Sequence, residues 1–185
     1  MNLSQLIKER RSVQLFEDRP VSVELLKELI DTAIWVPNHK MTQPWRFVIV
    51  QGESKKKIAE INRQLGEKGN SLEEKRANGE KAYKKINDVP VHLMVLMEEN
   101  PNQKLREEDY AATSCIIQNL SLLAWEQGIG MIWKTGAITF NPEFREVIGA
   151  RPGEKVVGML QMGYPQKVPK ERPRAGANEK VTELN

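Results

Sequence analysis

Hydrophobic side chains recur at helical spacing in two long stretches of this 185-residue chain. In residues 22–37, leucines and isoleucines fall three or four positions apart, which predicts an amphipathic helix that begins at Ser22 and stops by Pro37. A second, more apolar helix is predicted over residues 109–127 and ends at Gly128. Because its apolar positions cover most of the circumference, we expect burial on several sides, in a core or in a subunit interface.

Shorter apolar runs predict strands, and polar residues at capping positions predict two shorter helices. One of these helices begins at Asn2 and ends near residues 10–11, and the other begins at Asn141 and ends at Gly149. Helices and strands do not alternate strictly and no internal repeat exists, so the pattern indicates one α+β domain over residues 1–185. The predicted strands span residues 46–50, 91–97, 130–137 and 155–164.

The two remaining segments are polar. Residues 55–88 are rich in charge and predict helix, with breaks near residues 66–69 and residues 78–79. Few large apolar residues anchor this segment, so it is a candidate for a mobile flap. Residues 165–185 are rich in proline, lysine, arginine and glutamate, which predicts an extended tail whose order depends on lying across another surface.

The composition is typical of a soluble globular protein. Hydrophobic residues make up 39% and charged residues 29%, a balance that excludes a disordered chain. No apolar run is long enough to span a bilayer, and the first residues lack the basic start and apolar stretch of a signal peptide. We therefore expect a cytoplasmic protein without a membrane partner. The net charge of +3 permits anionic ligands but does not by itself argue for nucleic acid.

Metal-ligating and nucleophilic side chains are few, because the chain has one cysteine and two histidines. Cys115 alone cannot form an intrachain disulfide or a cysteine-based metal site, and two histidines exclude a histidine-rich one. We therefore predict no metal centre. Cys115 lies in an apolar helical context that favours a buried structural thiol, and His92 lies within a predicted strand and is expected to be structural.

Residues 35–47 have an unusual composition, with two tryptophans, two prolines, a histidine and a glutamine between a predicted helix and a predicted strand. This segment cannot be regular helix, and ordering it is costly unless it binds or packs against something. Upstream, residues 10–12 combine two guanidinium groups with a hydroxyl, which suits a phosphate monoester. The same two arginines also suit the negative end of a helix, so a charged helix cap is the alternative.

Motifs of several common enzyme classes are missing. Gly128 and Gly130 are not followed by the rest of a dinucleotide-binding glycine motif, and neither a Walker lysine motif nor Gly-x-Ser-x-Gly occurs. A Rossmann dinucleotide site and nucleoside triphosphate hydrolysis are therefore disfavoured.

Five short segments together resemble the nitroreductase family of FMN-dependent oxidoreductases. Their order and spacing fit the family across nearly the whole chain, and residues 37–40 and 133–136 resemble most closely its short, minimal YdjA-like branch. The five segments are residues 9–13 (Glu-Arg-Arg-Ser-Val), 33–37 (Ala-Ile-Trp-Val-Pro), 43–47 (Gln-Pro-Trp-Arg-Phe), 128–130 (Gly-Ile-Gly) and 133–136 (Trp-Lys-Thr-Gly).

The resemblance implies a nitroreductase-like fold, with a central, mostly antiparallel sheet of four to five strands flanked by helices and a C-terminal tail that extends onto the partner subunit. It also implies a homodimer with FMN at the subunit interface. The implied enzyme transfers hydride from NAD(P)H through FMN to nitroaromatic or quinone-like acceptors by a ping-pong mechanism. Because the flavin ring carries this chemistry, no catalytic side chain is expected.

The resemblance also assigns residues to the flavin. Residues 10–12 would hold its phosphate and ribityl end, and residues 133–136 would line it in the same chain. Trp35 and His39 would reach it from the other chain, while residues 43–45 would shape the loop near the ring. The implied cofactor-binding residues are Arg10, Arg11, Ser12, Trp35, His39, Gln43, Pro44, Trp45, Trp133, Lys134, Thr135, Gly136 and Arg172.

Some assignments stay open in the sequence. Residues 43–47 are interpreted as leading into the strand beneath the chain's own site. Arg172 and Arg174 are candidates for a further phosphate contact, and a solvated basic tail fits them equally well. Asn38 and Met41 stand where many family members have serine and asparagine, so the acceptor cannot be transferred from better-known members. The choice between NADH and NADPH is open as well.

Simpler interpretations accompany these assignments. Trp35 could instead close the core at the end of a helix, and His39 could be a surface residue. Trp133 could be shared between the core and the wall of a ligand site. A flavin-binding storage or redox-sensing protein without nicotinamide-dependent turnover is the alternative function. A third function, a basic interaction protein that uses the charges of residues 55–85, leaves the loop at residues 35–47 unexplained.

Overall fold

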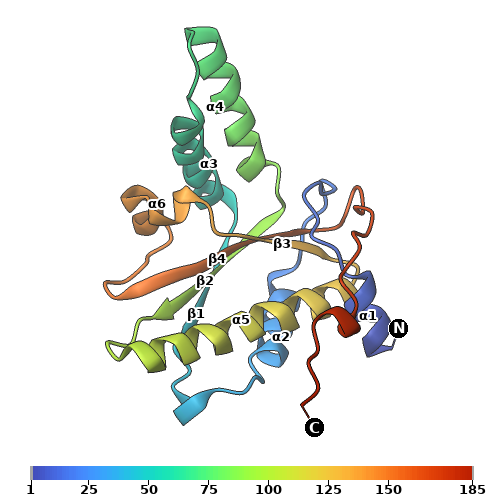
Figure 1. The fold of residues 1–185 in the computed structure, drawn as a ribbon. Helices are drawn as coiled ribbons and strands as arrows, with labels where there is room; N and C mark the ends of the chain where they lie inside the picture. The colour runs from blue at the N-terminus through green and yellow to red at the C-terminus, as the bar shows by residue number, and fades with distance from the viewer. Residues whose placement is uncertain (1, 185) are drawn as a thin grey trace.

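The computed structural model describes residues 2–184 (Figure 1). Helices and a single sheet are interspersed along the chain, which confirms the α+β prediction. With η denoting a 3₁₀ turn, the elements in chain order are α1 (Leu3–Glu9), α2 (Val23–Ala33), η1 (His39–Met41), β1 (Trp45–Val50), α3 (Gly52–Gly66), α4 (Leu72–Asn87), β2 (Val91–Glu98), α5 (Gln103–Glu126), β3 (Gly130–Lys134), η2 (Ala137–Phe140), α6 (Pro142–Val147), β4 (Glu154–Gly163) and η3 (Ala177–Glu179).

The four strands form one antiparallel sheet in the order β1-β2-β4-β3. β2 and β4 are central, so β1 and β3 form opposite edges. Trp45 lies opposite Met97 at the start of β1, and Gly130 lies opposite Gly163 at the start of β3. Three strand spacings of about 4.8 Å separate the two edges, so their backbones lie about 14 Å apart.

Helices cover both faces of the sheet (Figure 1). α2 and α5 pack on one face, whereas α3, α6 and the end of α4 pack on the other. β2 contacts both layers, because Leu93 and Val95 pack with α2 and α5 while Met94 and Leu96 pack with α3 and α6. Burial on both faces explains why this strand is an uninterrupted apolar run in the sequence.

α5 lies with one side against the sheet and one side exposed. Its start precedes the predicted residue 109, because Asn102 caps the helix by accepting a hydrogen bond from Leu105 N at 3.2 Å. Ile116 is fully buried on the sheet side. Cys115 is exposed in the single chain, so the prediction of a thiol buried in the core is wrong: its apolar neighbours face the sheet, whereas Cys115 faces outward. Burial of this thiol in a subunit interface stays a prediction.

α3 and α4 form a helical hairpin that projects from the body of the molecule (Figure 1). The chain reverses near residues 66–69, as predicted, but the predicted break at residues 78–79 is wrong because α4 runs through it. Gly79 allows close helix packing instead. A Cβ there would lie 2.8 Å from Glu67 Cγ and 3.3 Å from the carbonyl oxygen of Arg63. Whether the hairpin acts as a flap stays a prediction.

The tail from residue 165 to residue 184 is extended apart from η3 and is mostly exposed. Its first residues run along the N-terminal segment: Phe16 and Pro165 form a bridge, and Gln166 N donates to the carbonyl oxygen of Leu15 at 3.0 Å. In the part of the chain that the structure describes, no helix combines the length and the apolar character needed to cross a membrane.

Candidate functional site

The segment after α1 runs beside β3. Ser12 forms a parallel bridge with Met131, and Val13 N donates to the carbonyl oxygen of Met131 at 3.1 Å. This close approach needs a glycine at position 130, since a Cβ there would lie 2.6 Å from Val13 Cγ2. The packing therefore fixes residues 10–12 at the start of β3.

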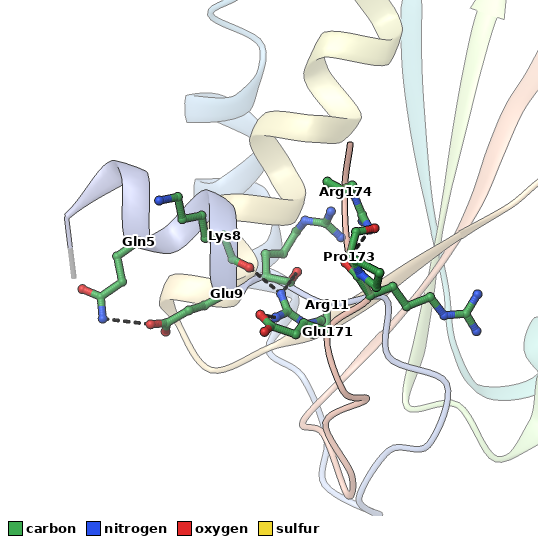
Figure 2. A network of polar contacts seen from close by, with 9 residues as sticks. Gln5, Lys8, Glu9, Arg11, Glu171, Pro173 and Arg174 are labelled. Carbon is green, nitrogen blue, oxygen red and sulfur yellow. Dashed lines mark hydrogen bonds and ion pairs between the residues drawn. The ribbon is translucent and has the colours of Figure 1, made fainter. Parts of the chain in front are cut away.

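Arg11 closes the end of α1. Its Nη1 donates to the carbonyl oxygens of Lys8 and Arg10, at 2.5 Å and 3.0 Å, and its Nη2 pairs with Glu171 at 3.2 Å (Figure 2). These bonds satisfy carbonyl groups that lack helical partners at the end of α1. The helix-cap interpretation therefore describes Arg11, whose guanidinium is largely engaged within the chain.

Arg10 is in a different environment. Its Nε is buried and has no hydrogen-bond partner within residues 2–184. Burial, followed by the neighbouring charges of Arg11 and Arg174, lowers the pKa of Arg10 from its usual value. Arginine stays protonated at neutral pH all the same, and no carboxylate of residues 2–184 forms an ion pair with Arg10. A bound anion would supply both an acceptor and the missing negative charge. We refer to Arg10, Arg11 and Arg174 as the arginine cluster.

Arg174 brings the tail to this cluster (Figure 2). Its Nη1 donates to the carbonyl oxygen of Arg172 at 2.9 Å, so Arg172 contacts Arg174 through its backbone. Of these two tail arginines, it is Arg174 whose charge, after that of Arg11, lowers the pKa of Arg10. Among the carboxylates of residues 2–184, Glu171 alone pairs with the cluster, and its side chain is 85% exposed. An exposed pair of this kind is weak and is readily replaced by a stronger anion.

Further along β3, Trp133 rests on β4. Its indole Nε1 donates to the carbonyl oxygen of Val157 at 3.0 Å, and its ring lies over Gly158. The side chain nevertheless keeps 37% of its surface exposed. Trp133 therefore combines a packed side with an open side, as the interpretation of a residue shared between core and ligand wall requires.

Lys134 ends β3, about 10 Å along the strand from Met131. It is half-buried, and no carboxylate of residues 2–184 forms an ion pair with it. Thr135 and Gly136 follow and are exposed. Successive side chains of a strand point to opposite faces, so Trp133 and Lys134 leave β3 in different directions. Because β3 is an edge strand, a flat ligand at that edge can contact both.

The loop at residues 35–44 lies at the opposite edge of the sheet, before β1. Trp35 is 86% exposed and Met41 is 68% exposed, so the interpretation of Trp35 as a core residue is wrong. His39 and Gln43 are exposed as well. Within one chain the strand order keeps these side chains away from the arginine cluster and β3.

Pro44 and Trp45 lead into β1 and have structural contacts of their own. The carbonyl oxygen of Pro44 accepts from Glu98 N at 2.9 Å, and Trp45 is half-buried against the core formed with α2 and α5. β1 lies at the edge of the sheet opposite β3, so residues 43–47 lead into a strand that does not adjoin β3, and their place beneath the chain's own site stays a prediction. Strand order arises from non-local pairing, which the local sequence does not reveal.

Asp109 of α5 also contributes to this loop, a role that its sequence context does not reveal. Thr42 Oγ1 donates to the Asp109 carboxylate on α5, and Asn38 Nδ2 donates to Thr42 Oγ1 at 3.0 Å. Asp109 is only 3% exposed. The sequence shows a carboxylate near the start of an apolar helix, and this pattern does not distinguish a buried carboxylate from a solvated one.

His92 is buried in β2 and makes a structural contact. Its Nε2 donates to the carbonyl oxygen of Ile86 at 2.9 Å. Burial is the main cause that lowers the pKa of His92 to about 4, so its ring is neutral at pH 7. Across residues 2–184, no three histidine, cysteine, aspartate or glutamate side chains gather as a metal site would need.

The sequence pattern of the Nitroreductase family matches residues 7–164. The chain belongs to this family. The matched region includes Arg10, Arg11 and both edges of the sheet, and it ends just after β4. The tail that carries Arg174 lies outside it.

Curated relatives of this nitroreductase-family protein match it over most of its length. "Putative NAD(P)H nitroreductase YfhC" of Bacillus subtilis (strain 168) is 36% identical over 187 residues, which cover 98% of this chain and 94% of the relative. "Putative NAD(P)H nitroreductase YdjA" of Escherichia coli (strain K12) is 31% identical over 170 residues, which cover 89% of this chain and 88% of the relative. The resemblance to YdjA-like nitroreductases is thereby confirmed.

Solved structures confirm the nitroreductase fold. The nitroreductase-like family protein from Bacillus cereus superposes with a TM-score of 0.87 at 39% identity, covering 100% of this chain and 96% of that one. The FMN and NADPH-dependent nitroreductase NfnB from sphigopyxis sp. strain HMH superposes with a TM-score of 0.77 at 20% identity, covering 100% of both chains.

Proposed function

We propose that this protein is a homodimeric, FMN-dependent oxidoreductase that uses NAD(P)H to reduce nitroaromatic or quinone-like acceptors. Membership of the nitroreductase family supports the class of enzyme, and NfnB, which shares the fold, is an FMN and NADPH-dependent nitroreductase. The observation that carries the proposal is the buried, unpartnered Nε of Arg10, next to the charges of Arg11 and Arg174.

The arginine cluster fits the phosphate group of FMN. Arg10 offers a donor with no acceptor in the described chain, and Arg174 lies close enough to add a second guanidinium. Forked guanidinium donors suit the oxygens of a phosphate dianion, and the exposed Ser12 adds a neutral hydroxyl beside them. Phosphate would also compete with Glu171 for Arg11.

The end of β3 would then hold the ring system. Trp133 offers the exposed part of an indole that β4 holds in place, and Thr135 and Gly136 continue this edge. Lys134 is half-buried without a carboxylate partner, so its positive charge is free to act on a ligand. A cation there would favour the electron-rich pyrimidine end of reduced FMN and so tune its reduction potential.

Two chains would complete the site. Trp35, His39 and Gln43 are exposed at the edge opposite β3, so they reach a flavin held at β3 only from a second copy. Such a copy would also cover the exposed apolar surface of Trp35 and Met41, 86% and 68% exposed in the isolated chain. The extended tail is a further segment available to reach a partner subunit.

Bound FMN would supply the hydride chemistry, taking two electrons from NAD(P)H and giving them to the acceptor. The side chains of this chain would bind the phosphate, orient the ring and exclude water, and none is assigned a catalytic role. Nicotinamide and acceptor would use the same open ring face in turn, so we expect ping-pong kinetics.

Purification of the full chain tests the proposal. We expect either a yellow protein or a colourless one that takes up one FMN per chain, and anaerobic addition of NADH or NADPH should bleach the flavin absorbance. Initial rates with a nitroaromatic and a quinone should give parallel double-reciprocal lines. Sedimentation should show a dimer.

Each failure has a separate meaning. A chain that takes up no FMN contradicts the proposal as a whole. Flavin that neither nicotinamide reduces supports the storage or redox-sensing alternative. A monomer that binds FMN at full stoichiometry contradicts the site shared between two chains.

A further inference from the structure

The loop between α2 and β1 has an unusual backbone. Lys40, Met41 and Gln43 have positive φ angles of 57°, 51° and 44°. Residues other than glycine seldom adopt this left-handed backbone conformation, because their Cβ atom then lies too close to the backbone. Three such residues within four positions persist only where surrounding contacts hold them.

Asn38 and Thr42 provide those contacts through their side chains. Asn38 Oδ1 accepts from Gln43 N at 2.8 Å, and Asn38 Nδ2 donates to Thr42 Oγ1 at 3.0 Å. The Thr42 hydroxyl in turn donates to the carboxylate of Asp109. A hydroxyl that accepts one hydrogen bond and donates another links the loop directly to α5.

Asp109 is a rigid anchor for this link. It lies in α5, which packs on the sheet, and it is 3% exposed. Its own backbone carbonyl accepts from Thr113 Oγ1 at 2.8 Å. A buried carboxylate is costly without donors, and the Thr42 hydroxyl is the donor that the loop supplies. The loop and the carboxylate therefore stabilise each other.

We propose that Asn38, Thr42 and Asp109 form a latch that positions the loop against the flavin of the partner subunit. Asp109 is a positioning residue in this scheme, since it acts through Thr42. The latch joins the loop to α5, whereas the side chains of Trp35 and Met41 are 86% and 68% exposed and free to contact a second copy. The inference rests on the proposed function, because only that function brings the loop to a flavin.

Three variants of the full chain separate the latch from general effects. Thr42→Val removes the hydroxyl and keeps the size of the side chain, and Thr42→Ser restores the hydroxyl. Thr32→Val is the matched control, because within residues 2–184 the Thr32 hydroxyl bonds only to the Glu28 carbonyl of its own helix, at 3.2 Å. Thr42 and Thr32 are both exposed, so all three variants should fold.

Hydrogen exchange of the peptide that contains residues 38–44, measured without FMN, reports on the latch itself. Thr42→Val should speed exchange at the Gln43 amide about tenfold or more, since the loop loses a hydrogen bond to a charged group. Thr42→Ser and Thr32→Val should exchange like the unsubstituted chain. Unchanged exchange in Thr42→Val would overturn the latch.

Titration with FMN reports on positioning. Thr42→Val should weaken FMN binding about tenfold and Thr42→Ser should recover it. Faster exchange together with unchanged FMN affinity would overturn the positioning role and leave the flavin function intact. Failure of the unsubstituted chain to bind FMN would overturn the proposed function and the positioning role, while the exchange data would still show whether the latch orders the loop.

Discussion

The indole ring of Trp133 lies against Gly158, where an added Cβ would be 2.5 Å from the ring atom Cδ1. The same indole donates to the carbonyl oxygen of Val157 at 3.0 Å. β4 therefore gives Trp133 both a flat surface and an acceptor, although the side chain remains 37% exposed. The proposed ring-binding end of β3 thus depends on a glycine in the neighbouring strand.

Gly158→Ala should displace this indole. Overpacking of this kind typically lowers the free energy of unfolding by about 1–3 kcal/mol, and FMN binding should weaken with it. Urea unfolding and flavin titration measure the two effects. Gly176→Ala is the control, because Gly176 has an ordinary φ of −69° and its new Cβ would lie 3.8 Å from Glu179 Oε1, an ordinary contact distance.

A double-mutant cycle identifies the cause of the Gly158→Ala effect. In a Trp133→Ala background the new methyl group meets no indole, so the loss of stability from Gly158→Ala should largely disappear. An equal loss in both backgrounds would show that the alanine disturbs β4 by another route.

Arg10 and Arg11 should respond in opposite ways to substitution by glutamine. Arg10→Gln removes a half-buried cation whose buried Nε has no hydrogen-bond partner in residues 2–184, so it should weaken FMN binding by about tenfold or more without lowering stability. Arg11→Gln breaks the cap of α1, so it should lower the free energy of unfolding by about 1 kcal/mol and affect FMN binding less. Calorimetric FMN titration and urea unfolding should be run on both variants. The same pattern in both would contradict the division of roles.

This division shows where sequence reasoning reached its limit. Arg10 and Arg11 are identical neighbours, and only the fold shows that Arg11 closes a helix while the buried Nε of Arg10 has no acceptor among the described residues. The sequence did indicate the α+β class, and Asn141 with Pro142 marked the start of α6 correctly because capping is a local property. The start of a helix with a polar first turn is harder to predict, since α5 begins at Gln103 and not at the predicted residue 109.

Long-range relationships were beyond the sequence for a different reason. Whether the loop at residues 35–44 and β3 share an edge depends on which strands pair, and pairing joins residues far apart in the chain. The burial of Asp109 likewise depends on Thr42, which is distant in sequence. Periodicity describes one element at a time, so it finds the elements and not their neighbours.

Arg46 of β1 and Glu154 of β4 form a forked ion pair. Arg46 Nε donates to Glu154 Oε1 at 2.7 Å and Nη2 donates to Oε2 at 2.6 Å. Arg151 N also donates to Oε2 at 2.7 Å. The hydrogen bonds from Arg46 are the main cause that lowers the pKa of Glu154, so the native state favours its charged form.

Stability should therefore fall in acid through this pair. In the unfolded chain the pKa of Glu154 is about 4.3, whereas in the native state it is lower. The contribution of this pair to the free energy of unfolding is therefore fully present above about pH 4.3 and is lost as pH falls through the native pKa. Glu154→Gln should cost about 1–3 kcal/mol at pH 7 and show a smaller further loss between pH 5 and pH 3. Urea unfolding of both proteins at pH 7, pH 5 and pH 3 tests this expectation, with Glu146→Gln as the control because Glu146 is exposed.

His92 should give a second pH dependence, in a higher window. The native pKa of about 4 lies below the usual value of 6.5, so between these values the unfolded state binds a proton that the native state refuses. Stability contributed by neutral His92 is therefore complete above about pH 6.5 and decreases as pH falls, by about 1.4 kcal/mol for each pH unit.

The test compares His92→Gln with the unsubstituted chain at pH 7 and pH 5. Glutamine can still donate to the Ile86 carbonyl but does not titrate. From pH 7 to pH 5 the unsubstituted chain should lose about 2 kcal/mol more of its free energy of unfolding than the variant loses. Equal losses would mean that His92 accepts a proton inside the folded sheet, which would require its buried Nδ1 to find an acceptor that residues 2–184 do not provide. The burial of His92 between β1 and β4 makes that outcome incompatible with the packing of this sheet.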